Sequence, residues 1–207
     1  MVIDEFIKRY GIGLTGGVAS GKSTIASILR RMGKVVFDAD QLSREVVSSG
    51  SSALAQIVDV FGGKVLKQDG SLDRSAMRSL VFNSPEKRRQ LEGIIHPAVH
   101  DRLVQGIREK GLEELKDFWF YEASLIFENA RQQKFKEVWV AYCEPETQIK
   151  RLMSRDGIER ELALKIIESQ MPARKKRELA DFVIETKGSI ESVEMKVKNA
   201  LMELSSR

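Results

Sequence analysis

The sequence predicts an α/β fold, a five-stranded parallel sheet with helices on both faces, and three observations support this. Short, continuous apolar runs recur along the 207 residues, as strands buried on both faces require. Segments with apolar residues at helical spacing separate these runs, which indicates βαβ units. A glycine-rich loop stands between the first apolar run and the first helical segment. Hydrophobic residues make up 42% of the chain and charged residues 31%, a balance typical of a folded globular protein.

The strands are assigned from the apolar runs. We expect them at residues 11–14, 35–37, 118–121, 138–142 and 182–184. The second run ends at Asp38-Ala39-Asp40, and a helix is expected from Lys22 to the stop signal Gly33. The last helix repeats apolar residues at a spacing that buries one face: Val193, Val197, Leu201 and Leu204.

Two intervals are too long for simple crossovers between strands. Residues 41–117 have a mostly helical pattern, with breaks predicted at Gly62-Gly63, Asp69-Gly70, Asn83-Ser84-Pro85 and His96-Pro97. Residues 144–180 form a second helical interval that is rich in arginine and lysine. We therefore expect a nucleotide-binding core at 10–43, 117–145 and 179–207, a helical substrate domain at 44–116, and a basic lid at 146–178.

The strongest local signal is a phosphate-binding loop. Residues 16–23 match G-x-x-x-x-G-K-[ST] in full, with a strand predicted before the loop and a helix after it. Glycines let the backbone turn so that its N–H groups point inward, and the following helix adds the positive end of its dipole. We expect Lys22 to reach the β- and γ-phosphates of ATP, Ser23 to hold Mg²⁺ and Thr24 to contact the α-phosphate. The other predicted contacts of the nucleotide lie in the loop itself: Gly16, Gly17, Ala19, Ser20 and Gly21.

A pair of carboxylates closes the second predicted strand. Ligands bind beyond the carboxyl ends of strands in open α/β sheets, so Asp38 and Asp40 are candidates for the reacting site. Strand alternation would place both side chains on one face, where a kinase needs a carboxylate to accept a hydroxyl proton. The alternative is a helix N-cap followed by a solvated turn, because a helical pattern begins there. Spacing alone does not separate the two interpretations.

Composition excludes several classes of protein. A net charge of +4 and 7% aromatic residues do not indicate a nucleic-acid-binding face. The single cysteine, Cys143, rules out an internal disulfide, and we expect it to be an inert core thiol. No apolar run is long enough to span a bilayer, and residues 1–10 lack the apolar region of a secretory signal. We expect a cytoplasmic protein that does not bind membranes and is a monomer or a weak homo-oligomer.

From Gly13 onward the chain resembles the dephospho-coenzyme A kinase family. The resemblance depends on a series of short motifs whose combined order and spacing are specific. They are Leu14-Thr15-Gly16-Gly17, Gly21-Lys22-Ser23-Thr24, Asp38-Ala39-Asp40 with Arg44, Phe61-Gly62, Asp69-Gly70-Ser71-Leu72-Asp73-Arg74, Leu91-Glu92 with His96-Pro97, Leu125-Ile126-Phe127-Glu128, Gln148 with Arg151 and Arg155, Gln170, and Ala180-Asp181. The chain departs from the family pattern at Ser124, at Thr186 and at Val18-Ala19, where the family usually has proline, asparagine and Ile-Gly.

The resemblance implies transfer of the ATP γ-phosphoryl group to the ribose 3′-hydroxyl of dephospho-coenzyme A. It favours Asp40 as the base, with Asp38, Arg44 and His96 as substrate contacts. Arg151 and Arg155 lie one helical turn apart, a spacing that by itself indicates a solvated face. The family match instead implies that Arg151 is catalytic and that Arg155 contacts ATP.

Two alternatives for the function remain. One is another metabolite or nucleotide kinase on the same fold, and the other is a non-catalytic switch driven by ATP. Outside the proposed site, the basic run 174–177 is expected to be solvated surface, and Glu128 to support the site indirectly. His96 and His100 have the spacing of metal ligands, but without a third ligand nearby no zinc site is expected.

Overall fold

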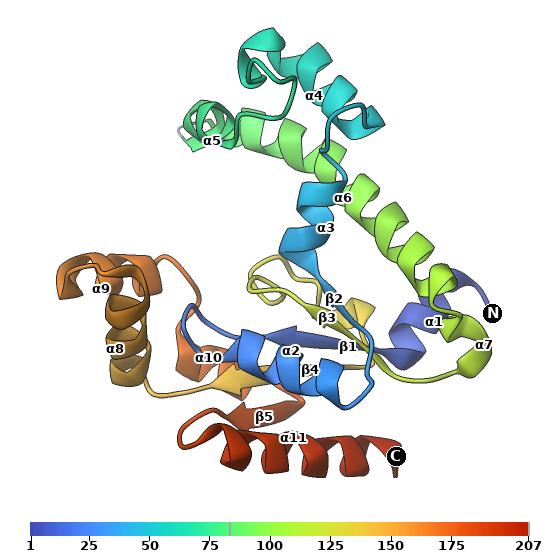
Figure 1. Ribbon diagram of the computed structural model, residues 1–207, viewed down its shortest axis with the longest axis vertical. Coiled ribbons are helices and arrows are strands. Elements are labelled where there is room, and N and C mark those ends of the chain that lie inside the picture. Colours follow the sequence, from blue (N-terminus) through green and yellow to red (C-terminus); the bar gives the residue numbers. More distant parts are fainter. Residues whose placement is uncertain (83, 207) are drawn as a thin grey trace. The chain divides into compact units, whose positions relative to one another are not determined.

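The computed structural model describes residues 1–82 and 84–206 (Figure 1). The chain divides into two compact units, one formed by Met1–Phe37 with Glu113–Arg207 and the other by Asp38–Leu112. The helices and strands are α1 Ile3–Tyr10, β1 Gly11–Thr15, α2 Lys22–Arg31, β2 Val36–Asp38, α3 Ala39–Glu45, α4 Ser52–Phe61, η1 Gly63–Val65, α5 Arg74–Phe82, α6 Pro85–Glu109, α7 Leu112–Leu115, β3 Trp119–Glu122, η2 Gln132–Lys134, β4 Glu137–Tyr142, α8 Pro145–Asp156, α9 Arg160–Glu168, α10 Ala173–Glu178, β5 Phe182–Glu185 and α11 Ile190–Ser205.

The first unit contains the five-stranded parallel sheet, in the order β2-β3-β1-β4-β5. The prediction of five strands is confirmed, with boundaries shifted by at most one residue. Strand β1 is buried throughout and pairs in parallel with β3 on one side and β4 on the other. This central position explains its uninterrupted apolar run, because both of its faces are covered.

One face of the sheet is covered by α2 and α11, which pack against each other (Figure 1). Their apolar stripes meet the strands in a single core that includes Ile25 and Ile28 of α2, Val197 of α11, and Phe120 and Trp139 of the sheet. The predicted helix from Lys22 and the predicted apolar face of the last helix are therefore confirmed. Because α2 begins at the glycine-rich loop, the packing of its stripe also fixes where that loop leaves β1.

The second unit is helical and has its own core. Helices α3, α4 and α5 pack on the long α6, around a cluster that includes Leu54, Ile57 and Val65. The breaks at Gly62-Gly63 and Asp69-Gly70 are confirmed, and Ser84 caps α6, whose first residue is Pro85. Asn83 lies outside the described residues.

The predicted break at His96-Pro97 is wrong, because α6 runs through both residues from Pro85 to Glu109. An internal proline removes a hydrogen bond of the helix and costs about 3 kcal/mol. Packing of α3, α4 and α5 along α6 offsets that cost, and Val99, Leu103 and Ile107 are buried on its inner face. Tertiary burial here outweighs a strong local stop signal.

The prediction that Asp38 and Asp40 share one face of a strand is also wrong. Strand β2 ends at Asp38, and α3 begins at Ala39. The cause is local: a carboxylate oxygen of Asp38 accepts hydrogen bonds from the N–H groups of Asp40 at 2.8 Å and Gln41 at 3.2 Å. Asp38 is thus the N-cap of a helix, and Asp40 belongs to that helix's first turn.

The second helical interval contains α8, α9 and α10, and α8 begins at Pro145 as expected. None of the helices formed by residues 1–82 and 84–206 combines the length and the apolar character that crossing a membrane requires.

Candidate active site

The glycine-rich loop connects the buried end of β1 to the first turn of α2. Two residues there have positive φ, Ala19 at 55° and Gly21 at 90°. Gly21 is the N-cap of α2, and a Cβ on it would lie 2.9 Å from the Cβ of Thr186. The helix therefore begins at the loop, and a helix N-terminus in this position is the arrangement that binds phosphate.

Side chains from distant parts of the first unit hold the loop backbone. The Val18 N–H donates to Oε1 of Gln170 at 2.8 Å, and Nε2 of Gln148 donates to the Val18 carbonyl at 2.7 Å. A Cβ on Gly17 would lie 2.5 Å from that same Nε2, so a side chain there would require Gln148 to move away from the loop. Both polar groups of one loop residue are thus occupied by the glutamines, which orients its peptide units before any ligand binds.

A second chain of hydrogen bonds reaches the loop through Thr186. Its hydroxyl donates to the Ser20 carbonyl at 2.5 Å, and its own carbonyl accepts from Nη2 of Arg151 at 2.6 Å. Nη1 of Arg151 also lies 3.1 Å from the Thr186 hydroxyl oxygen. Arg151, on α8, is therefore connected to the phosphate-binding loop through a single residue.

Lys22 lies against a buried carboxylate. Its ammonium nitrogen is 2.9 Å from Oε1 of Glu122, the last residue of β3, which is only 4% exposed. Arg30 approaches the other oxygen of Glu122 at 3.5 Å. Glu122 stands beside Leu14 in the parallel register of β3 with β1, so this carboxylate lies at the edge of the sheet where the loop begins.

The remaining candidate residues lie on other elements. Asp40 and Arg44 are four residues apart on α3, in the helical unit, and Asp40 is exposed. His96 is exposed on α6. Arg155 is exposed on α8, where it donates two hydrogen bonds to Asp156 that lower the pKa of that carboxyl and raise the pKa of the guanidinium.

A family model described as dephospho-CoA kinase matches residues 10–192. The chain belongs to the dephospho-CoA kinase family. It is 42% identical over 191 residues to the dephospho-CoA kinase of Geobacter sulfurreducens, covering 90% of this chain and 94% of that one. It is 40% identical over 190 residues to that of Carboxydothermus hydrogenoformans, covering 92% of each chain.

Two solved structures have a fold similar to that of this chain. The crystal structure of TT1252 from Thermus thermophilus has a TM-score of 0.80 and 33% identity, covering 95% of this chain and 98% of that one. The dephospho-CoA kinase of Campylobacter jejuni has a TM-score of 0.63 over 95% of this chain and 97% of its own, and at 24% identity it supports the fold alone. The resemblance inferred from the motifs is therefore confirmed.

In this member of the dephospho-CoA kinase family, sequence reasoning missed Glu122. The predicted strand ends at Tyr121, one residue before the end of β3, so the prediction leaves out the carboxylate of Glu122. A charged residue directly after an apolar run was the available signal, since strand ends of an open sheet point toward the ligand site. The roles of Gln148, Gln170 and Thr186 were not identified either, because each depends on a contact with residues more than 120 positions away.

The expectation of a solvated basic run at 174–177 is wrong for Lys176, which is fully buried. Its ammonium lies 2.8 Å from Oε1 of Glu128 and donates to the Ser124 carbonyl at 2.6 Å. The same carboxylate oxygen of Glu128 accepts a hydrogen bond from the Met171 N–H at 3.1 Å. Burial is tolerated because the charge is paired, and the pair connects α10 to the segment after β3.

Cys143 is buried as predicted, and burial raises the pKa of its thiol. Among residues 1–82 and 84–206, no three histidine, cysteine, aspartate or glutamate side chains are placed to hold a metal ion together.

Proposed function

We propose that this chain transfers the γ-phosphoryl group of ATP to the ribose 3′-hydroxyl of dephospho-coenzyme A. The observation that carries this proposal is the family match across residues 10–192. The glycine-rich loop of the matched chain is hydrogen-bonded by Gln148, Gln170 and Thr186. As in other kinases of this kind, the reaction would require little covalent chemistry from the protein and much positioning and charge stabilisation.

ATP is proposed to bind with its phosphates along residues 16–24. The N–H groups of the loop and of the first turn of α2 would contact phosphate oxygens, and Lys22 would move its ammonium from Glu122 toward the β- and γ-phosphates. Ser23 is exposed at the start of α2, and its hydroxyl is the kind of hard oxygen ligand that Mg²⁺ takes beside phosphates. The metal would supply neutralisation of charge on the transferring group.

Asp40 is proposed as the base. The 3′-hydroxyl oxygen forms a bond to the γ-phosphorus, the bond from that phosphorus to the β,γ-bridging oxygen breaks, and ADP leaves with the bond's electron pair. The hydroxyl proton passes to the Asp40 carboxylate, which is exposed and free of ion pairs with the described part of the chain. Asp38, Arg44 and His96 are proposed to contact the acceptor.

Arg151 and Arg155 are proposed to stabilise charge on the phosphoryl group and ATP, as parts of a lid formed by α8, α9 and α10. For Arg151 the support is its link through Thr186 to the loop carbonyl of Ser20. For Arg155 it is the family resemblance, and closure would require its guanidinium to leave Asp156.

A coupled assay of ADP release tests the function, with dephospho-coenzyme A compared against AMP, CMP and adenosine. The proposal predicts turnover that is fastest, by kcat/KM, with dephospho-coenzyme A. Preference for AMP or CMP would instead support a nucleotide kinase. Tight ATP binding without turnover on any acceptor would support a switch.

A further inference from the structure

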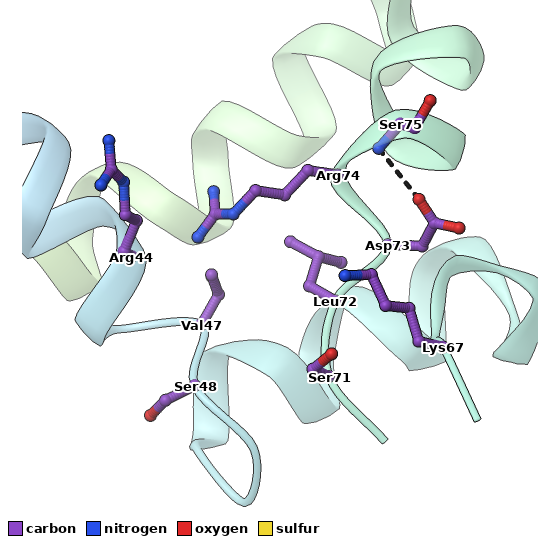
Figure 2. Close-up of a pocket in the computed structure, with 9 residues that line it drawn as sticks. All are labelled: Arg44, Val47, Ser48, Lys67, Ser71, Leu72, Asp73, Arg74 and Ser75. Atoms are coloured by element: carbon purple, nitrogen blue, oxygen red, sulfur yellow. Dashed lines mark hydrogen bonds between the residues drawn. The ribbon is translucent and has the colours of Figure 1, made fainter. Parts of the chain in front are cut away.

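A basic pocket lies within the helical unit, between the end of α3 and the start of α5 (Figure 2). It has a volume of about 370 Å³, which is in the range of small-molecule sites. Three cationic side chains line it, those of Arg44, Lys67 and Arg74. The Arg74 side chain extends from the start of α5 toward the part of α3 that carries Arg44 (Figure 2).

The positive charge of this pocket is largely uncompensated. Across residues 1–82 and 84–206, neither Arg44 nor Arg74 forms an ion pair or a hydrogen bond through its guanidinium. Lys67 acts by its charge on the exposed Asp69. The one carboxylate lining the pocket, Asp73, accepts the N–H groups of Ser75 and Ala76 at 2.9 Å each and so caps α5.

Like charges gathered around one cavity repel each other, and an anion bound there would relieve that repulsion. Arginine forks suit phosphate oxygens in particular, because the guanidinium offers paired donors in a plane. Ser48 and Ser75 also line the pocket, although their hydroxyl groups point away from its centre (Figure 2). The chemistry therefore fits a phosphate-containing ligand with more than one negative charge.

The position of Arg44 relates this pocket to the acceptor. Asp40 and Arg44 lie one turn apart on α3, which corresponds to about 6 Å along the helix axis. If Asp40 receives the 3′-hydroxyl of a ribose, a nucleoside lying along α3 would bring the group on its 5′ side toward Arg44. In dephospho-coenzyme A that part is a diphosphate bridge.

We propose that the pocket of Arg44, Lys67 and Arg74 binds the diphosphate bridge of the acceptor and so selects dephospho-coenzyme A over nucleosides that lack it. This inference rests on the proposed function for the identity of the ligand, but the pocket's affinity for diphosphate does not depend on it. Arg74 and Lys67 are specificity residues in this account and take no part in the proton transfer.

The test uses Arg74→Gln and Lys67→Gln, with Arg78→Gln and Lys64→Gln as matched controls. Arg78 lies one turn after Arg74 on α5, and Lys64 lies in η1; both are exposed and outside the pocket. Each pocket variant should raise KM for dephospho-coenzyme A at least tenfold. KM for ATP and kcat/KM for adenosine, which has the hydroxyl but no diphosphate, should stay unchanged. Arg74→Lys should recover part of the loss.

The controls should behave as the unsubstituted chain does, and thermal unfolding confirms that each variant is folded. If Arg74→Gln and Lys67→Gln leave KM for dephospho-coenzyme A unchanged in an active enzyme, the pocket proposal is overturned while the function stands.

If the unsubstituted chain fails to phosphorylate dephospho-coenzyme A, the proposed function fails, and calorimetry with inorganic pyrophosphate decides on the pocket. That titration is made with ADP and Mg²⁺ saturating the loop. Weaker binding to Arg74→Gln than to Arg78→Gln supports the pocket, and equal binding to both overturns it.

Discussion

The hydroxyl of Thr186 donates a hydrogen bond to the carbonyl oxygen of Ser20, so a residue directly after β5 fixes the backbone of the phosphate-binding loop. Both residues are buried, at 3% and 1% exposure, so water does not replace this bond when it is lost. Thr186 is one of the departures from the family pattern noted in the sequence, and its hydroxyl gives the loop a hydrogen-bond donor.

Thr186→Val should weaken both stability and ATP binding. Valine has nearly the shape of threonine but leaves the Ser20 carbonyl without its donor, which costs about 1–3 kcal/mol. We expect a lower free energy of unfolding in urea and a KM for ATP raised several-fold, with KM for the acceptor unchanged. Thr186→Ser keeps the hydroxyl and serves as the control. An unchanged KM for ATP in the valine variant would show that this contact does not position the loop.

Asp38 and Asp40 should differ in what their substitution changes. Asp40→Asn removes the proposed base and should lower kcat by about 10²–10⁴-fold with little effect on stability, because the side chain is exposed. Asp38→Ala removes the N-cap of α3 and should cost about 1 kcal/mol of stability, whereas Asp38→Asn retains a good cap. Steady-state kinetics and urea unfolding of the three variants separate the roles. Near-normal kcat for Asp40→Asn would exclude that residue as the base.

The buried pair of Lys176 and Glu128 should show an asymmetric response to substitution. Glu128→Gln leaves a fully buried ammonium without its counter-charge, and breaking a buried pair in this way costs about 3–5 kcal/mol. Lys176→Met fills the space with an apolar chain and leaves only the partly exposed carboxylate unpaired, so we expect a smaller loss. Urea unfolding measures both, with Lys175→Met as an exposed control. Equal losses for the two variants would contradict the account of Lys176.

Ala19 has a positive φ, where a Cβ is unfavourable by about 1–2 kcal/mol. Ala19→Gly removes that strain. The greater freedom of glycine in the unfolded chain lowers the stability by about 0.4–1 kcal/mol. The net expectation is a gain in unfolding free energy of up to about 1.6 kcal/mol, with KM for ATP unchanged. A loss of stability in thermal unfolding would mean that the alanine methyl group makes contacts worth more than the strain.

Much of the fold follows from short-range pattern. The strands were predicted because a parallel sheet buries both faces and leaves continuous apolar runs, and the loop because its glycines and lysine occur in a fixed order. The predictions are wrong where a single side chain or an element distant in sequence determines the local structure. Strand β2 ends at Asp38 because its carboxylate caps α3. Helix α6 continues past Pro97 because other helices pack along it. Lys176 is buried because it pairs with Glu128.

The site was predictable to the extent that its residues lie in local motifs. Lys22, Asp40 and Arg44 are proposed as site residues from such motifs. Glu122 was adjacent to a predicted strand and could have been found from the charge at the strand's end. The contacts of Gln148, Gln170 and Thr186 with the loop join residues far apart in sequence. A local pattern of apolar and polar residues does not predict such contacts.

The position of the transferred phosphate tests the central claim most directly. The chain is incubated with ATP, Mg²⁺ and dephospho-coenzyme A, and the product is analysed by phosphorus NMR and mass spectrometry. The account predicts one new phosphate monoester, on the ribose 3′-oxygen, with ADP formed in equal amount and product formation lost in Lys22→Ala. Release of ADP with only inorganic phosphate, or a phosphate on any other oxygen of the acceptor, would contradict it.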